Sequence, residues 1–160
     1  MTCHIQENTD DDNILLQILM AMEALDCPTV YPVHPRNHER VKRLDAEYKF
    51  RNLIFCTPVG YLMSVYLTNH AEKIVTDSGG LQREAFFAEK QCVTVFDYVG
   101  WPETMIDNRN QLAKPDKEDI LRKLEAKQTV RADEKPFGDG KSGEKIAAII
   151  VDYFEGIDKV

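Results

Sequence analysis

The chain has 160 residues, of which 43% are hydrophobic and 29% are charged, and this composition excludes disordered, collagenous and low-complexity proteins. A chain of this length fits one domain and buries roughly two thirds of its unfolded surface. The formal net charge of -7 argues against broad binding to nucleic acid or to anionic membranes, since both require a basic face.

The cysteines stand singly, with no CxxC pair, and this spacing suits neither a zinc site nor a disulfide framework. They are Cys3, Cys27, Cys56 and Cys92. We therefore expect reduced, structural thiols, and we expect no metal and no other cofactor. The amino-terminal segment lacks the apolar stretch of a signal peptide, and no apolar run approaches membrane-spanning length. A cytoplasmic location is the expectation.

The first half of the chain alternates between helical and strand patterns. Apolar residues from Ile14 to Leu25 recur at helical spacing after the capping acids of Asp10–Asp12. The elements expected next are a strand at Thr29–Val33, a helix at His38–Tyr48, a strand at Asn52–Cys56 and a helix at Tyr61–Asn69.

The second half continues the alternation. The expected elements are a strand at Lys73–Thr76, a helix from Gly79 to about Ala88, a strand at Cys92–Phe96, a helical turn at Pro102–Asp107, a short strand at Gln111–Ala113, and a helix introduced by Pro115 and Asp116 that runs through Leu124. A last helix at Gly143–Phe154 is expected to place four apolar residues on its inner face: Ile146, Ile149, Ile150 and Tyr153.

Strands that alternate with helices of about ten residues predict right-handed crossovers and a mostly parallel sheet covered on both faces. The fold class is therefore α/β, a Rossmann-like three-layer sandwich, with residues 1–160 as a single domain. Ligands of such sheets bind at the carboxyl ends of the strands. The residues that follow the strands are His4, His34, Thr57, Pro58, Asp77–Gly80 and Asp97–Trp101.

The strongest local signal is the stretch TDSGGLQREA at Thr76–Ala85. Paired glycines at a strand-to-helix junction let the backbone approach a ligand, and the first-turn amides offer unpaired donors at the positive end of the helix. This pattern favours a phosphate held by Ser78, Gly79 and Gly80. The alternative is a tight turn with a serine or aspartate cap and no ligand. Glu84 is a candidate acceptor for ribose hydroxyls, or a solvated helix residue.

Two histidines follow predicted strands, His4 in TCHIQEN and His34 in PVHPR. A lone histidine is usually structural or exposed, but two at the ligand-facing edge of one sheet make a site more plausible. The glycine-rich stretch KPFGDGKSGE at Lys135–Glu144 lacks the Walker spacing and follows no strand. It is expected to cap and position the last helix.

Taken together, these stretches resemble the carboxy-terminal domain of the UDP-N-acetylglucosamine 2-epimerase family. The matches run in family order over nearly the whole chain. They are Thr2–His4 with Glu7 (the family's THRxEN-type segment), Pro32–Pro35 (PVHP), Asn69–Ala71 with Thr76–Ala85 (NHA…TDSGGxQxEA), Pro102–Glu103 (PE) and Gly138–Lys141 (GDGK).

The resemblance implies one half of a glycosyltransferase-B-type fold, with the amino-terminal half absent from this sequence. The family interconverts UDP-N-acetylglucosamine and UDP-N-acetylmannosamine by eliminating and re-adding UDP, and a hydrolysing branch releases N-acetylmannosamine. By matching motif, Ser78, Gly79 and Gly80 would hold the diphosphate and Glu84 the ribose. His4 would assist UDP departure as a catalytic residue, and His34 would line the interdomain region.

The sequence departs from the family pattern at two places. Ile5 stands where the family has an arginine after the histidine, and Trp101 precedes the PE pair in a segment that has lost both family arginines. An arginine beside a diphosphate contributes charge-assisted, bidentate hydrogen bonds. The loss of the two arginines before Pro102 leaves open whether UDP binding and the reaction survive here, whereas Ile5 bears on the second, regulatory UDP-sugar that some members of the family bind between the domains.

Three hypotheses follow. The first is a half-enzyme that binds UDP or a UDP-N-acetylhexosamine and needs a separate amino-terminal domain for catalysis, because an acid and a base must flank the sugar. The second is a degenerate binding or interaction module without a nucleotide site. The third is another glycosyltransferase-B protein that uses UDP-sugars. A homodimer is a further expected partner state, and neither nucleic acid nor membrane is an expected partner.

Overall fold

The computed structural model describes residues 1–127 and 135–157, and the chain divides into two compact units, Met1–Val130 and Arg131–Val160. All strands of the described residues lie in the first unit. The second unit contains one long helix. No helix in the described ranges is long and apolar enough to cross a membrane.

The strands of the first unit form two parallel ladders. β1 (Thr29–Pro32) pairs with β2 (Leu53–Cys56), and the second ladder has the order β3 (Lys73–Thr76), β4 (Gln91–Val95) and β5 (Asn110–Ala113). All pairings are parallel, and each short strand matches a predicted one to within about two residues.

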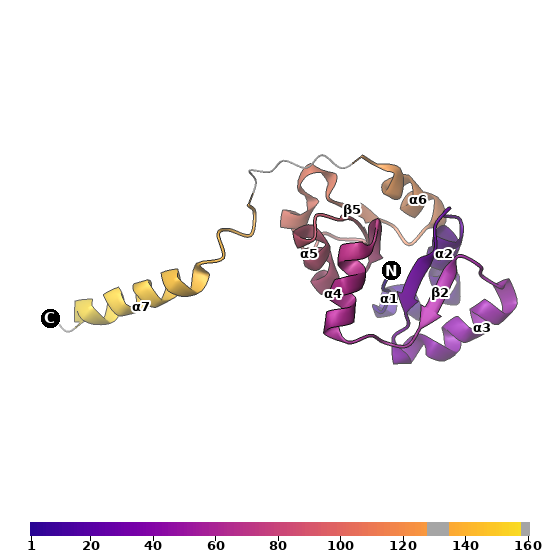
Figure 1. The fold of residues 1–160 in the computed structure, drawn as a ribbon, viewed down its shortest axis with the longest axis horizontal. Coiled ribbons are helices and arrows are strands. Elements are labelled where there is room, and N and C mark those ends of the chain that lie inside the picture. Colours follow the sequence, from indigo (N-terminus) through magenta and orange to yellow (C-terminus); the bar gives the residue numbers. More distant parts are fainter. Residues whose placement is uncertain (128–134, 158–160) are drawn as a thin grey trace. The chain divides into compact units, whose positions relative to one another are not determined.

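The start of the chain joins the two ladders. Thr2 forms a parallel bridge with Thr76 of β3, and its amide donates to the Val75 carbonyl at 3.0 Å. On the other side, the Met1 ammonium donates to the Val30 carbonyl of β1 at 2.6 Å. Residues 1–3 therefore lie between β1 and β3, and the amino terminus sits in the middle of the unit (Figure 1).

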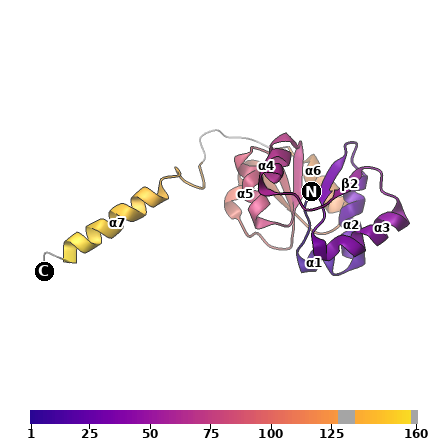
Figure 2. The same ribbon diagram turned by 60° about the horizontal axis from the view of Figure 1, so that its bottom comes forward.

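Helices cover both faces of these strands, so the three-layer, Rossmann-like prediction is confirmed. α2 packs against α6 on one face, and α4 packs against α5 on the other (Figures 1 and 2). The α-helices of this unit are α1 (Gln6–Thr9), α2 (Asp12–Glu23), α3 (His38–Tyr48), α4 (Tyr61–His70), α5 (Gly79–Phe87) and α6 (Lys117–Glu125), with 3₁₀ helices at Pro35–Asn37 and Pro102–Asn108.

Local sequence accounts for these elements. In α2 the apolar stripe is buried at Leu15, Ile18 and Met22, and the Asp11 carboxylate caps the helix by accepting from two first-turn amides. Every residue of β4 is buried, as expected of a strand covered on both faces. The turn predicted at Pro102–Asp107 is a 3₁₀ stretch whose helical backbone breaks at Ile106 and Asp107.

The second unit contains α7 (Ser142–Ile157) and the glycine-rich stretch before it. Gly138 and Gly140 adopt φ of +79° and +77°, which glycine tolerates best, and Asp139 accepts from the Lys141 amide at 3.1 Å. This stretch leads directly into α7. The residues predicted to form an inner face, Ile146, Ile149, Ile150 and Tyr153, are exposed within their own unit.

Candidate functional site

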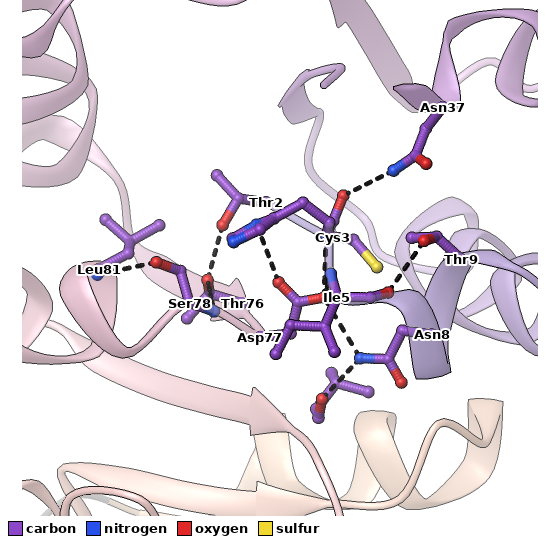
Figure 3. A network of polar contacts seen from close by, with 12 residues as sticks. Thr2, Cys3, Ile5, Asn8, Thr9, Asn37, Thr76, Asp77, Ser78 and Leu81 are labelled. Carbon is purple, nitrogen blue, oxygen red and sulfur yellow. Dashed lines mark hydrogen bonds and ion pairs between the residues drawn. The ribbon is translucent and has the colours of Figure 1, made fainter. Parts of the chain in front are cut away.

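Asp77, the residue that follows β3, lies at the centre of a polar network (Figure 3), and its side chain is fully buried. Its Oδ2 accepts from the backbone amides of His4 and Ile5, each at 2.9 Å, and from Asn8 Nδ2 at 3.3 Å. Its Oδ1 lies 3.2 Å from His4 Nδ1. A single carboxylate thus fixes both the backbone and the imidazole of His4.

Neighbouring strands reinforce this network through short polar side chains (Figure 3). The hydroxyls of Thr2 and Thr76 lie 2.6 Å apart, and the Ser78 amide donates to Thr76 Oγ1 at 2.9 Å. Asn8 Nδ2 also donates to the Val95 carbonyl at the end of β4, at 2.8 Å. Residues 2–8 and the carboxyl ends of β3 and β4 are therefore held together by side chains.

The two predicted histidines lie together at this edge of the sheet. The rings of His4 and His34 stack with centroids 6.2 Å apart and an interplanar angle of 26°. His34 Nδ1 accepts from the Arg36 amide at 3.3 Å, and the Arg36 guanidinium donates to the His4 carbonyl. The loop after β1 is in this way tied to the segment after residues 1–3.

At the junction of β3 and α5, Ser78 is the helix N-cap, and its Oγ accepts from the Leu81 amide at 3.5 Å. Ser78 therefore caps the helix, as one of the two interpretations of this turn predicted. Ser78, Gly80 and Glu84 also line a cavity of about 1070 Å³ that His4 and His34 line from the other side. The structure therefore places five of the six predicted site residues around one cavity.

The remaining predicted residue, Gly79, lies against Trp101. A Cβ on Gly79 would stand 2.7 Å from Trp101 Nε1, so only glycine fits beneath the indole. The Arg83 guanidinium lies 4.1 Å from the centroid of the Trp101 ring, and Arg83 Nε donates to the Gly79 carbonyl at 3.3 Å. Trp101 and Arg83 therefore pack across the start of α5.

Beneath the site, buried groups stay neutral. Burial, followed by the nearby Asp77 carboxylate, raises the pKa of the Cys3 thiol well above its ordinary value. Burial also raises the pKa of Tyr31, whose hydroxyl donates to the Cys3 carbonyl at 2.9 Å. In the part of the chain that the structure describes, no group of three or more histidine, cysteine or acidic side chains could hold a metal ion.

Sequence reasoning placed Asp77 and Trp101 at the ligand-facing edge of the sheet without giving either a role, and it did not single out Asn8 or the contact between Arg83 and Trp101. Asp77 stands inside the quoted motif, directly before Ser78, so its position was a usable signal. Asn8 and Trp101 were out of reach, because their partners lie 69 or more residues away for Asn8 and about 20 for Trp101.

Comparison with known proteins decides the family. The model of the UDP-N-acetylglucosamine 2-epimerase family matches residues 1–151. This chain belongs to that family. The match covers β1 to β5 and the polar network around Asp77, together with most of α7.

Individual relatives agree. A UDP-N-acetylglucosamine 2-epimerase homolog from Methanococcus maripaludis is 37% identical over 93% of this chain and 43% of its own length. A UDP-N-acetylglucosamine 2-epimerase from Methanocaldococcus jannaschii is 35% identical over 94% of this chain and 43% of its own length. The chain thus spans less than half the length of these relatives.

A solved structure of the Methanocaldococcus jannaschii epimerase, in complex with UDP-GlcNAc and UDP, superposes with a TM-score of 0.79 at 34% identity. It covers 94% of this chain, and this chain covers 44% of it. The fold is therefore that of one half of a glycosyltransferase-B-like epimerase.

Proposed function

We propose that this chain is the nucleotide-binding half of a UDP-N-acetylglucosamine 2-epimerase and binds the UDP part of a UDP-N-acetylhexosamine. The observation that carries the proposal is the convergence of His4, His34, Ser78, Gly80 and Glu84 on one cavity at the carboxyl ends of the strands. The relative crystallised with UDP-GlcNAc and UDP shares this fold.

The diphosphate would lie against the start of α5. The first-turn amides of this nine-residue helix point toward its amino end, where the helix dipole favours an anion. Gly79 and Gly80 carry no side chain to block the approach, and the Ser78 hydroxyl, whose oxygen accepts from the Leu81 amide, would donate its own proton to the diphosphate. Glu84, one and a half turns further, would accept hydrogen bonds from the ribose.

His4 would assist the departure of UDP. Its Nδ1 faces the buried Asp77 carboxylate at 3.2 Å, and such a partner orients an imidazole. Nε2 is then the nitrogen directed to the ligand. From this position it would donate a proton to the leaving diphosphate oxygen as the bond between the sugar and that oxygen breaks.

The family arginines have a candidate substitute in Arg83. Trp101 takes the position of an arginine before the PE pair, and its ring carries the Arg83 guanidinium at 4.1 Å, next to Gly79. A cation at this place would offset the charge of a diphosphate at the helix start. We assign this role to Arg83.

Epimerisation needs a base at C2 of the sugar, on the side opposite the His4 edge. We propose that a separate amino-terminal domain supplies this base, with residues 1–160 acting as one half of the enzyme. The share of 43% that this chain covers in its relatives supports the division. A cytoplasmic location fits the free cysteines, and a homodimer is a further possibility for assembly.

The test is calorimetric titration of the chain with UDP at low salt, repeated on Ser78→Ala and Glu84→Ala. Each variant is expected to weaken binding about fivefold to twentyfold, the loss of one or two hydrogen bonds to a charged or ribose group. Glu118→Ala, an exposed acid on α6, is the matched control and should bind like the unmodified chain.

A second candidate is a degenerate module that keeps the fold without the nucleotide site. The observation in its favour is the loss of the arginines at Ile5 and Trp101. It predicts that Ser78→Ala and Glu84→Ala change no ligand response and that millimolar UDP gives no heat of binding. That result would overturn the proposed function.

A further inference from the structure

Trp101, the residue whose indole covers Gly79, is held by its own backbone carbonyl. That carbonyl accepts from the Thr104 amide at 3.0 Å and from the Thr104 hydroxyl at 2.8 Å. Pro102 follows directly, and its ring fixes the next φ angle of the chain. Thr104 therefore fixes the backbone that carries the indole to the start of α5.

Thr104 is in turn held by side chains of the sheet. Its Oγ1 accepts from Asn110 Nδ2 of β5 at 2.9 Å, and Asn110 Oδ1 accepts from Thr94 Oγ1 of β4 at 2.8 Å. Each of these three residues is at most 3% exposed. Because buried polar groups cannot exchange their partners for water, breaking any one of these bonds carries the full cost of desolvation.

The order of donors and acceptors makes Asn110 the decisive member of this chain. A threonine hydroxyl has one proton, and the proton of Thr104 goes to the Trp101 carbonyl. The oxygen of Thr104 must therefore accept from its other partner, which is the amide nitrogen of Asn110. A carboxylate has no proton to donate and an aliphatic side chain neither donates nor accepts, so this position requires a side-chain amide.

The end of β4 thus anchors both sides of the candidate site. Thr94 begins the chain of hydrogen bonds that leads to Trp101. The carbonyl of the next residue, Val95, accepts from Asn8 Nδ2, which also bonds to Asp77. Two adjacent residues of one strand therefore fix the indole on one side and the buried carboxylate on the other.

We propose that Asn110 is a positioning residue for the candidate site, and that it holds Trp101 against Gly79 through Thr104. In this way it also keeps the Arg83 guanidinium, 4.1 Å from the centroid of the indole ring, at the start of α5. The inference rests on the proposed function, because this cation offsets the charge of a diphosphate only if UDP binds there. Asn110 itself touches no ligand and acts through the indole.

The experiment uses the fluorescence of the chain, which contains a single tryptophan and therefore reports on Trp101 alone. Asn110→Asp keeps the size of the side chain but removes the donor, so the Thr104 hydroxyl turns from the Trp101 carbonyl to the carboxylate. Thr104→Val removes the hydroxyl and keeps its shape, and it tests the same link if Asn110→Asp does not fold. In both variants the emission maximum should move to longer wavelength and quenching by acrylamide should increase.

A conservative variant and a core variant serve as controls. Thr104→Ser restores the hydroxyl and should return the emission to that of the unmodified chain. Ile120→Val removes one methylene from the core beside α6, so it lowers stability without touching the chain of hydrogen bonds and should leave the emission unchanged. In calorimetric titration, Thr104→Val should bind UDP about threefold to tenfold more weakly, and Thr104→Ser should recover the affinity.

Three results would overturn the inference. Unchanged emission and quenching in Thr104→Val would show that the hydroxyl does not hold the indole. A shift in Thr104→Val with none in folded Asn110→Asp would exclude Asn110 as its origin. A shift with unchanged UDP affinity would show that the held indole does not serve the site. The fluorescence of the free chain needs no UDP, so a failure of this inference is distinguishable from a chain that binds no UDP.

Discussion

The two ends of one cavity differ in the polarity of the residues that line them. At the carboxyl ends of the strands, the Asp77 carboxylate accepts hydrogen bonds on Oδ2 from the backbone amides of His4 and Ile5, and its Oδ1 faces the His4 imidazole. At the amino ends, apolar side chains and the backbone edges of Val30 and Val75 form the walls. The polar groups of the candidate site therefore gather at one end of the cavity, and apolar side chains gather at the other.

The largest expected effect breaks the polar end. Asp77→Ala leaves the amides of His4 and Ile5 and the Asn8 side chain without their acceptor. We expect a loss of about 3–5 kcal/mol in the free energy of unfolding, because buried donors then lack partners. Urea denaturation measures it.

The matched control for that substitution is Asp97→Ala, an exposed acid that follows β4. It should change the free energy of unfolding by less than about 0.5 kcal/mol. Equal losses in the two variants would mean that Asp77 is not the centre of the network.

The next effect tests the packing of Trp101 across the start of α5. Gly79→Ala places a Cβ 2.7 Å from Trp101 Nε1 and forces the indole to move. We expect a destabilisation of about 1–3 kcal/mol from this overpacking. Thermal unfolding of Gly79→Ala, Trp101→Ala and the double variant forms a cycle in which the second substitution should relieve the first.

Gly60→Ala is the control for the glycine effect, since no atom lies within 4 Å of a Cβ at that position. Strictly additive losses in the cycle would show that Gly79 and Trp101 do not collide. UDP titration of the same variants would then report whether the packing of Trp101 on Gly79 contributes to binding.

The third prediction concerns the apolar end and its pH dependence. Burial lowers the pKa of the Met1 ammonium from its ordinary 8.0 to about 6. Between these values the unfolded chain binds more protons, so stability rises from pH 6 to pH 8 and falls as the pH drops through this window. The slope is at most about 1.4 kcal/mol per pH unit.

Urea midpoints at pH 6, 7 and 8 measure this slope, and acetylation of the amino terminus removes the titrating group. The difference between the free and acetylated chains should therefore shrink as the pH rises. If the difference in stability between the two chains stayed constant from pH 6 to pH 8, the ammonium would not be desolvated by folding.

The smallest effect concerns the difference in reactivity between the buried and the half-buried cysteine thiols. Burial raises the pKa of Cys92 to about 12 and that of Cys3 well above its ordinary value, so neither forms a thiolate at pH 8. Cys27 and Cys56, which are both half-buried, should react with iodoacetamide before the buried Cys3 and Cys92. Mass spectrometry of partly labelled protein gives the order, and early labelling of Cys92 would contradict its burial.

Much of the fold could be predicted from the sequence because its signals are local. The apolar period of α2 and the caps at Asp11 and Asp116 are read within a few residues. The glycine-rich turn at Ser78 is equally local, and the family motifs predicted the fold that the structure and its relatives confirm. What stayed out of reach were contacts between distant segments.

Met1 illustrates the limit. Nothing in the neighbouring sequence indicates that Met1 bonds to β1 or that Thr2 pairs with β3, because these contacts depend on strands 29 and 74 residues further along. Trp101 is a second example of a contact that the local sequence does not indicate. The sequence showed that an arginine was replaced, but only the fold shows that Arg83 stacks on the replacement.

One cavity is lined both by polar residues of the site, Ser78 and Glu84, and by apolar residues, Met22 and Leu124. A molecule bound against either set would therefore form part of the boundary of the other. Thermodynamic linkage makes such a relation mutual: a second ligand that tightens UDP binding by some factor is itself bound more tightly, by the same factor, when UDP is present.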